Sequence, residues 1–320
     1  MVGGSLMANP AWSPTLARAA RKAVDYIRKA KSEATQRAYA ADWADFSGWC
    51  ARHALVALPA DPATVVLYLT DLAERVKAST LQRRVTALGQ AHEAAGHPSP
   101  TGVSVVRECL KGIRRTIGTA QDKATPVLVE DLQAMVNALD LGSPLGLRDR
   151  ALLCLGFAAA LRRSELVGLD VADLEWREQG LVLNLRRSKT DQEAAGRRVA
   201  VVKARNGLCA VNALKVWLEA AEITEGPVFR AVNKGGKVGS DRLSDRAVDL
   251  VVRRLAQAVD LIGNFSAHSL RAGLATSAAR AGLSERDIAK QTGHQNMTVL
   301  RGYIREGDLF RNNVTGNLEL

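Results

Sequence analysis

The chain has 320 residues, of which 47% are hydrophobic, and it carries a formal net charge of +11. This length is enough for two domains, and this hydrophobic content excludes an intrinsically disordered protein. The positive charge indicates a polyanionic partner, and most of the excess lies in residues 1–118, with 16 Lys and Arg against 9 Asp and Glu.

The first third of the chain has the apolar spacing of five short helices. Ser13-Pro14 is a favourable helix start, because serine caps a helix and proline suits the first helical position. Further starts are expected at Ser32-Glu33, Asp61-Pro62 and Ser79-Thr80, with a last helix from about Gly102 to Ile117. One apolar face on each helix predicts a compact helical bundle.

Basic side chains gather on the fourth and fifth of these expected helices. Such a cluster can contact phosphates, although an ordinary solvated helix face would look the same in sequence. The candidates for DNA contact are Arg83, Arg84, Lys111, Arg114 and Arg115.

The polar stretch around residues 119–126 lacks periodicity and is expected to be a linker. Helices are then expected at 128–139 and 148–163, followed by strands at 181–185 and 198–202 with a hairpin loop between them. Further helices are expected at 210–221, 244–259, 267–281 and 285–292. We therefore predict a mainly α chain with a small antiparallel sheet: a helical bundle at 1–118, an α+β domain at 127–320, and a tail from about 306.

Other classes of protein are disfavoured. The four cysteines form no CxxC pair, so a zinc site or a disulfide framework is not expected, and buried reduced thiols are. The longest apolar run, Ala151 to Leu161, is too short to span a bilayer, and the first ten residues resemble no signal peptide. We expect a cytoplasmic protein without a metal or cofactor.

Chemically useful side chains concentrate in the second half. One segment reads His268-Ser269-Leu270-Arg271, and His294 and Tyr303 follow it. Upstream lie Leu161-Arg162-Arg163-Ser164-Glu165 and Lys189, the latter in the expected hairpin loop. Arginine suits a phosphate in a transition state because its planar fork binds two oxygens and keeps its charge. Tyrosine needs a base or a strong cationic field to become a nucleophile.

Each of these motifs is weak alone, and in isolation each residue more often packs or faces solvent. His268 and Arg271 share one helix face near an expected cap at Ser266, where an anion would be favoured. Arg163 competes with Arg162 for the catalytic role. Glu165 could orient Arg162 through a hydrogen bond.

The ordered set Arg162, Lys189, His268, Arg271, His294 and Tyr303 resembles that of the tyrosine recombinases, the phage integrase family. The family pattern Leu-Arg-x-Ser-Glu selects Arg162. Within the family the chain looks closest to the Cre-like recombinases. One departure is that Cre has tryptophan where this chain has His294, whereas the wider family commonly has histidine.

The resemblance implies a clamp around double-stranded DNA. Tyr303 would attack the scissile phosphate to leave a 3′-phosphotyrosine and a free 5′-hydroxyl, and Lys189 would protonate the departing oxygen. Strand exchange would pass through a four-way junction in a tetramer, without metal or ATP, on inverted repeats around a short spacer. Arg246, at the start of an expected helix, would read a base. The apolar tail would dock on its own or a neighbouring protomer.

Two other functions remain open at this point. A type IB topoisomerase also forms a 3′-phosphotyrosine and would relax supercoils without needing two sites. A helical DNA-binding regulator would need the basic helices but not the ordered catalytic set.

Overall fold

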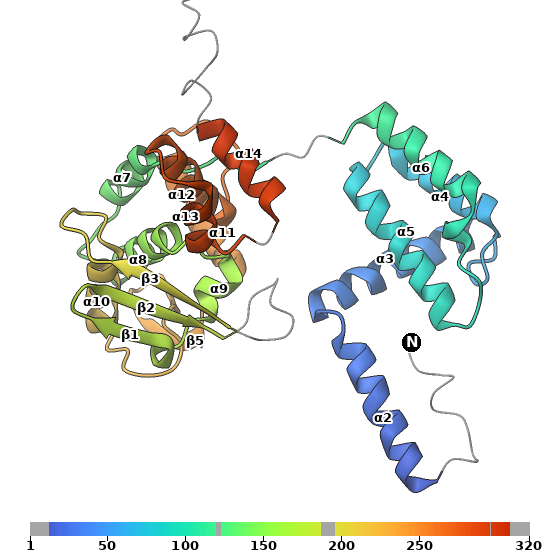
Figure 1. Cartoon of the computed structure of the whole chain (residues 1–320), viewed down its shortest axis with the longest axis horizontal. Helices are drawn as coiled ribbons and strands as arrows, with labels where there is room; N and C mark the ends of the chain where they lie inside the picture. The colour runs from blue at the N-terminus through green and yellow to red at the C-terminus, as the bar shows by residue number, and fades with distance from the viewer. Residues whose placement is uncertain (1–12, 120–122, 187–195, 295, 308–320) are drawn as a thin grey trace, which may run out of the picture. The chain divides into compact units, whose positions relative to one another are not determined.

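The chain divides into two compact units, Met1–Gln121 and Asp122–Leu320 (Figure 1). The computed structural model describes residues 13–119, 123–186, 196–294 and 296–307. Within these residues the chain is mainly helical with two small antiparallel sheets, which confirms the predicted fold class.

Unit 1 contains α2 (Pro14–Lys29), α3 (Glu33–Arg52), α4 (Pro62–Ala73), α5 (Ala78–Ala94), the 3-10 helix η1 (Pro100–Gly102) and α6 (Ser104–Ile117). Three predicted caps are confirmed, because the side chains of Ser13, Ser32 and Asp61 each accept a hydrogen bond from a backbone N–H of the helix that follows. The expected cap at Ser79-Thr80 is wrong. The helix α5 begins at Ala78, so both residues lie inside its first turn, and Lys77 at its N-cap makes no side-chain cap.

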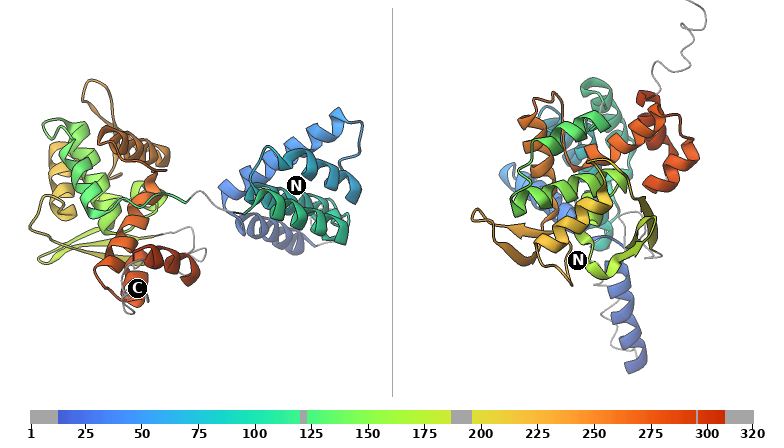
Figure 2. Two further views of the ribbon diagram at one scale, coloured as in Figure 1. Left: turned by 90° about the horizontal axis from the view of Figure 1, so that it is seen from above. Right: turned by 90° about the vertical axis from the view of Figure 1, so that its left-hand side faces the viewer.

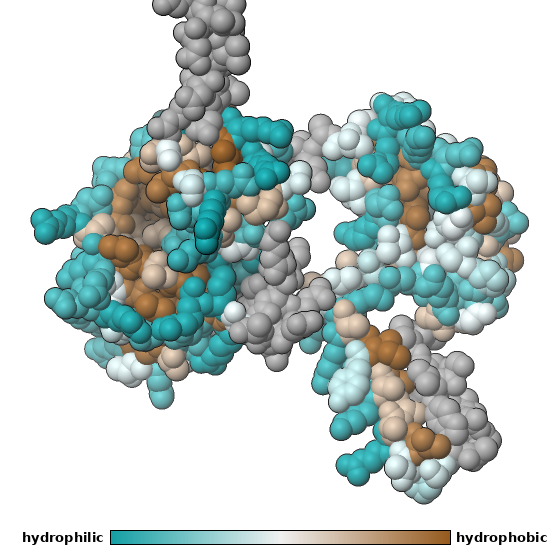
Figure 3. Space-filling view, viewed as in Figure 1, coloured by the Kyte–Doolittle hydropathy of each residue, from teal (hydrophilic) through white to brown (hydrophobic). Residues whose placement is uncertain are grey.

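The hydrophobic core of unit 1 comes from α3, α4, α5 and α6. Phe46, Tyr68, Leu69 and Leu81 are fully buried there. All five predicted helices are present, but α2 supplies no side chain to this core cluster, and its buried residues are Ala20 and Val24. Its apolar residues Leu16, Tyr26 and Ile27 are exposed, and Figure 3 shows hydrophobic side chains along its visible face.

Unit 2 begins with α7 (Val129–Asn137), α8 (Pro144–Ala158), α9 (Arg163–Gly168) and the 3-10 helix η2 (Val171–Asp173). The predicted single helix at 148–163 is wrong at both ends. Ser143 caps α8 through its hydroxyl, which accepts from the N–H of Gly146. The break after Ala158 includes Ala160, whose φ of +48° leaves the helical region and separates α8 from α9.

The larger sheet has the order β1-β2-β3, with strands Leu174–Arg177, Gly180–Leu185 and Arg197–Val202, all antiparallel. Leu181 pairs with Val201 and Leu183 with Val199, so one face of the sheet is buried. The expected strands are therefore confirmed, whereas β1 was not predicted. A second sheet of β4 (Arg230–Val232) and β5 (Val238–Arg242) was also missed. Its largely exposed residues carry no alternating apolar pattern.

The remaining helices of unit 2 are α10 (Ala210–Ala220), α11 (Asp245–Ala258), α12 (Ala267–Arg280), α13 (Glu285–Thr292) and α14 (Met297–Gly307). Helix α8 packs against α10 and α12, and its residues 151–155 are buried (Figure 1, Figure 2). A smaller apolar cluster joins α12, α13 and α14 through residues that include Ala272, Ala275 and Leu300. Alanine on α12 allows α14 to approach closely.

No helix in the described parts of the chain is long and apolar enough to cross a membrane. All four cysteines carry free thiols. Three of them are buried as expected, whereas Cys109 is only half-buried.

Candidate active site

The candidate catalytic side chains come from five places in unit 2. Arg162 stands immediately before α9, and Glu165 lies within its first turn. His268 and Arg271 lie in the first turns of α12, His294 follows α13, and Tyr303 lies on α14. The structure brings all six of these residues together, as the contacts below show. Lys189 lies outside the described residues.

The hydroxyl of Tyr303 lies 2.7 Å from Nε2 of His268. The ring centroid of Tyr303 is 6.1 Å from that of His268 and also 6.1 Å from that of His294. The tyrosine side chain packs into the apolar cluster of α12, α13 and α14, which restricts its rotamers. A neutral His268 can therefore accept the phenolic proton directly.

Arg271 is the most deeply buried cation of the site, with 1% of its surface exposed. Its Nη1 donates to the carbonyl oxygen of Ala160 at 2.6 Å, in the break between α8 and α9. Its Nη2 is buried and has no hydrogen-bond partner among the described residues. Burial, and then the positive charge of Arg162, lower the pKa of Arg271 to about 10. The group is still a cation at neutral pH, with donor capacity left for an anion.

Glu165 holds Arg162 by two atoms. One carboxylate oxygen accepts from Nη1 of Arg162 at 2.5 Å, and the other accepts from the Arg162 backbone N–H at 3.0 Å. The glutamate side chain is 1% exposed, so this carboxylate is stable only with cationic partners. Glu165 therefore has two roles: it orients the Arg162 side chain, and it stabilises the start of α9.

Arg163, the alternative to Arg162 for the catalytic role, contacts helix α11 instead. Its guanidinium forms ion pairs with Asp245, at 3.0 Å, and with Asp249 on α11. The other carboxylate oxygen of Asp249 accepts from the N–H of Ala267 at 2.8 Å. The contacts of Arg163 thus join α9, α11 and α12, and they support the choice of Arg162 as the phosphate ligand.

The pKa values of both histidines of the site lie below the ordinary value of 6.5. The pKa of His294 is lowered to about 3 by burial and then by the charges of Arg271 and Arg162. Partial burial and the same two arginines lower the pKa of His268. Nδ1 of His294 lies 2.7 Å from the Thr292 hydroxyl. These rings can accept or share a proton but do not add permanent charge.

Gly293 turns the chain so that His294 faces the site. Its φ of +63° is left-handed, as expected for the glycine that ends a helix. Any side chain at Gly293 would also collide with the guanidinium of Arg197.

Arg197, which the sequence reasoning did not select, lies at the first position of β3. Its Nη1 donates to the carbonyl oxygen of Gln291 at 3.1 Å, and its Nη2 lies 3.9 Å from a carboxylate oxygen of Glu165. Strand alternation places Arg197 and Arg198 on opposite faces, but the sequence alone does not say which face meets the site.

The residues expected to contact DNA have diverse environments. Arg246 is exposed in the first turn of α11, and the hydroxyl of Ser244 caps that helix by accepting from the N–H of Ala247. On α6 the three exposed candidates are Lys111, Arg114 and Arg115.

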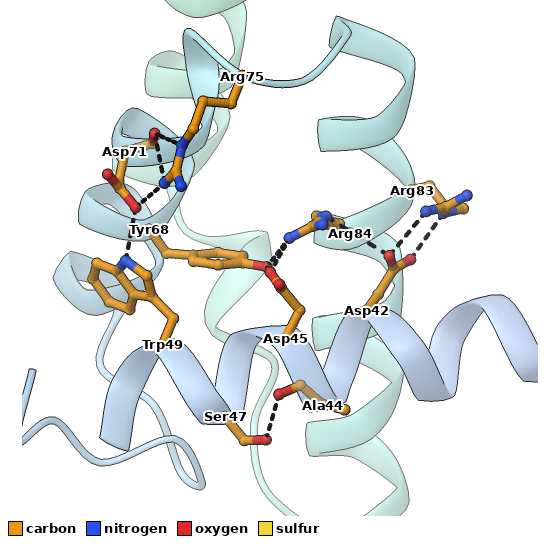
Figure 4. A network of polar contacts seen from close by, with 10 residues as sticks. All are labelled: Asp42, Ala44, Asp45, Ser47, Trp49, Tyr68, Asp71, Arg75, Arg83 and Arg84. Atoms are coloured by element: carbon orange, nitrogen blue, oxygen red, sulfur yellow. Dashed lines mark hydrogen bonds and ion pairs between the residues drawn. The ribbon is translucent and has the colours of Figure 1, made fainter. Parts of the chain in front are cut away.

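The two arginines of α5 are engaged by carboxylates, as Figure 4 shows. Arg83 donates twice to Asp42, at 2.8 and 2.9 Å, and remains about half exposed. Arg84 is only 14% exposed and contacts Asp45 and the Tyr68 hydroxyl. Arg84 therefore joins α3, α4 and α5, and this structural role was not foreseen.

Comparison with known proteins adds an independent observation. The sequence pattern of the phage integrase family matches residues 127–308. An integrase/recombinase XerD homolog from Selenomonas ruminantium is 40% identical over 306 residues, which are 94% of this chain and 90% of that protein. Recombinase Cre of Escherichia phage P1 is 25% identical over 88% of this chain and 86% of its own. The higher identity to the XerD homolog means that the Cre-like branch is not singled out.

Solved structures share the fold at low identity. A lambda integrase dimer bound to a COC′ core site has a TM-score of 0.62 and 15% identity, covering 97% of this chain and 85% of that one. The XerH recombinase in a post-cleavage complex with a palindromic difH substrate has a TM-score of 0.58 and 16% identity, covering 81% of this chain and 72% of that one.

Proposed function

The chain belongs to the phage integrase family, the tyrosine recombinases, and we propose that it is a site-specific DNA recombinase with Tyr303 as its nucleophile. The observation that carries the assignment of the nucleophile is the 2.7 Å contact between the Tyr303 hydroxyl and Nε2 of His268. The charges of Arg162 and Arg271 both act on His268, and Arg271 also interacts electrostatically with Tyr303. A phenol beside a neutral base and two arginines is equipped for attack on a phosphate.

In the proposed first step the phosphodiester keeps its single negative charge, and two protons move: one from Tyr303 to His268 and one from Lys189 to the departing 5′ oxygen. The Tyr303 oxygen bonds to the scissile phosphorus as its proton passes to His268, and the bond from phosphorus to the 5′ oxygen breaks. The departing 5′ oxygen takes up a proton, for which Lys189 is the proposed donor. The products are a 3′-phosphotyrosine and a free 5′-hydroxyl, so a 5′-hydroxyl from a partner strand can reverse the step without ATP.

Arg162 and Arg271 are the proposed ligands of the nonbridging phosphate oxygens, where charge accumulates in the transition state. The unpartnered Nη2 of Arg271 supports this role, because a buried donor without a partner is stabilised when an anion arrives. His294 is proposed to hydrogen-bond the same phosphate.

Double-stranded DNA is the proposed substrate, with inverted repeats around a short spacer. Arg246 is the proposed base-reading residue, while Lys111, Arg114 and Arg115 are the proposed phosphate contacts of unit 1. Arg83 stays in this set through its exposed half, whereas the largely buried guanidinium of Arg84 and its contact with Asp45 favour a structural role. We place the activity in the cytoplasm, in a bacterial, phage or plasmid context.

Assembly into a tetramer on paired sites is a further part of the proposal. The tail at 308–320 lies outside the described residues. Its five apolar residues are proposed to dock on a neighbouring protomer: Leu309, Phe310, Val314, Leu318 and Leu320. Deleting 308–320 should spare binding to one half-site and abolish paired-site assembly, measured by gel shift and light scattering. If the truncated chain still assembles normally on paired sites, the tail does not link neighbouring protomers.

A covalent trap tests the nucleophile. The DNA site is one that the protein itself selects from randomised DNA. The probe is a duplex with a nick near the cleavage position in this site, so that the short fragment with the released 5′-hydroxyl diffuses away and cannot be religated. The wild-type chain should form an SDS-resistant adduct, and Tyr303→Phe should bind equally well without forming one. Tyr26→Phe, at an exposed tyrosine of α2, is the matched control and should keep the adduct.

A two-site assay separates recombination from the topoisomerase alternative. Recombinant product from a plasmid with two sites is expected, and relaxation of a plasmid with no site is not. An adduct with relaxation but no recombinant product would favour the topoisomerase. Binding without any adduct would favour a non-enzymatic regulator.

A further inference from the structure

We propose that Arg197 is a positioning residue of this site, which holds Glu165 and the turn that presents His294. The part of the proposal that concerns DNA cleavage rests on the proposed function. Arg197 has no assigned role in the catalytic set predicted from the sequence.

Arg197 joins three segments that are distant in sequence. From the first position of β3, its guanidinium donates to the carbonyl oxygen of Gln291 in the last turn of α13. Its other terminal nitrogen lies 3.9 Å from Glu165 in α9. The last carbonyls of a helix lack intrahelical partners, so a guanidinium at this end satisfies one of them and complements the helix dipole.

The same carboxylate therefore faces two guanidiniums. Glu165 pairs with Arg162 at 2.5 Å and with Arg197 at 3.9 Å. Arg162 hydrogen-bonds both carboxylate oxygens, whereas the Arg197 nitrogen makes no hydrogen bond to Glu165 and supplies a second positive charge beside it. Removing the Arg197 charge would weaken the electrostatic stabilisation of this buried carboxylate, which orients the proposed phosphate ligand Arg162.

The packing around Gly293 shows how tightly Arg197 fits against the His294 turn. A Cβ atom built on Gly293 would lie 2.1 Å from Nη1 of Arg197 and 2.6 Å from its Cζ. The left-handed φ of Gly293 favours glycine, and a side chain at this position would displace the Arg197 guanidinium. The guanidinium thus supports the turn directly before His294, whose Nδ1 contacts Thr292.

Arg198, the next residue, is a matched control. It lies on the same strand but its side chain is 60% exposed and pairs with Glu175 of β1. Arg197 is 23% exposed. Replacing either arginine by methionine removes one positive charge and keeps a similar stem.

The first experiment uses the free full-length chain and needs no DNA. Imidazole ¹⁵N resonances at pH 7 report the tautomer of His294 and its contact with Thr292, and His294→Gln assigns them. Arg197→Met should shift or broaden the His294 signals, while Arg198→Met should leave them unchanged. Unchanged His294 signals in a folded Arg197→Met chain would overturn the proposal.

The second experiment follows cleavage of the nicked duplex at saturating protein. Arg197→Met should lower the rate of adduct formation by about 10- to 100-fold with half-site affinity unchanged, since small displacements of catalytic groups cost this much. Arg198→Met should cleave at the wild-type rate. A loss of affinity with an unchanged rate would make Arg197 a DNA contact instead.

Arg197→Lys keeps the charge but cannot reach Gln291 and Glu165 together. It should recover only part of the rate, and full recovery would show that charge alone is needed. If Arg197→Met does not fold, the cleavage rate of Arg197→Lys relative to the wild-type chain still tests whether Arg197 is a positioning residue. If the wild-type chain forms no adduct, the proposed function fails, while the ¹⁵N signals of His294 still decide the role of Arg197.

Discussion

Nε2 of His268 lies 2.7 Å from the hydroxyl of Tyr303, although the two residues are 35 positions apart in the chain. The contact joins α12 to α14, and both helices pack through the same small apolar cluster. Packing therefore holds the ring of Tyr303 beside His268, the proposed acceptor of its proton, before DNA arrives.

The arginines should differ sharply in their importance for cleavage. Arg162→Ala and Arg271→Ala each remove a proposed phosphate ligand, so each should slow adduct formation by about 10²- to 10³-fold. Arg163→Ala breaks ion pairs to Asp245 and Asp249 but leaves the phosphate ligands, so the loss should be much smaller. Single-turnover cleavage of the nicked duplex compares the three variants. Our choice between the neighbours is refuted if Arg163→Ala is the most damaging.

Protonation of His294 should link pH to the stability of unit 2. The folded pKa is about 3, below the ordinary value of 6.5, so at intermediate pH the unfolded chain binds a proton that the folded chain does not. Stability is then complete above about pH 6.5 and falls as the pH drops toward 3, with a loss of about 2 kcal/mol at pH 5. The lowered pKa of His268 acts in the same direction.

Urea unfolding at pH 7.5 and pH 5 tests this linkage. His294→Gln cannot take up the proton, so its stability should change less between the two pH values than that of the wild-type chain. Equal changes would contradict a strongly lowered pKa for His294.

Cleavage should survive an excess of EDTA. The groups around Tyr303 include the arginines Arg162 and Arg271, which can themselves neutralise the phosphate charge that a metal ion would otherwise neutralise. Adduct formation on the nicked duplex, with and without EDTA, is the measurement. Loss of the chemical step in EDTA and its return with magnesium would refute this prediction.

Affinity for DNA should fall steeply with salt. Each phosphate contact contributes a slope of about −0.9 in log K against log salt, so 6–10 contacts predict a slope of about −5 to −9. Arg115→Met should reduce the slope by about one contact, because this side chain is exposed on α6. A slope near zero would mean that the excess positive charge is only solvated surface.

Arg84→Met should act on stability more than on DNA binding. It would leave the carboxylate of the half-exposed Asp45 and the hydroxyl of the fully buried Tyr68 without their cation, at a cost of about 1–2 kcal/mol in unfolding free energy. Arg115→Met is the control and should leave unfolding unchanged. An Arg84→Met chain with wild-type stability and a reduced salt slope would restore the original expectation of a phosphate contact.

The sequence by itself determined the local features of the fold. Ser13, Ser32 and Asp61 begin helices as predicted, and Gly293 ends one. A helix cap depends on hydrogen bonds between residues two or three positions apart, so the order of residue types is enough to reveal it. The identity and order of the candidate catalytic residues were likewise readable, because that chemistry needs particular side chains.

The tertiary structure decided what each of two like neighbours contacts. The family pattern had already favoured Arg162 over Arg163 in the sequence, whereas no local pattern separates Arg197 from Arg198. The choice depends on contacts across the fold, such as Arg163 with Asp249 of α11 and Arg197 with Gln291 of α13. Contacts across the fold also decide the environment of Arg84, which pairs with Asp45 of a different helix. They likewise decide that α2, which has an apolar face, lies outside the core cluster of unit 1. Burial and pairing depend on residues tens of positions apart, and only the folded chain brings these residues together.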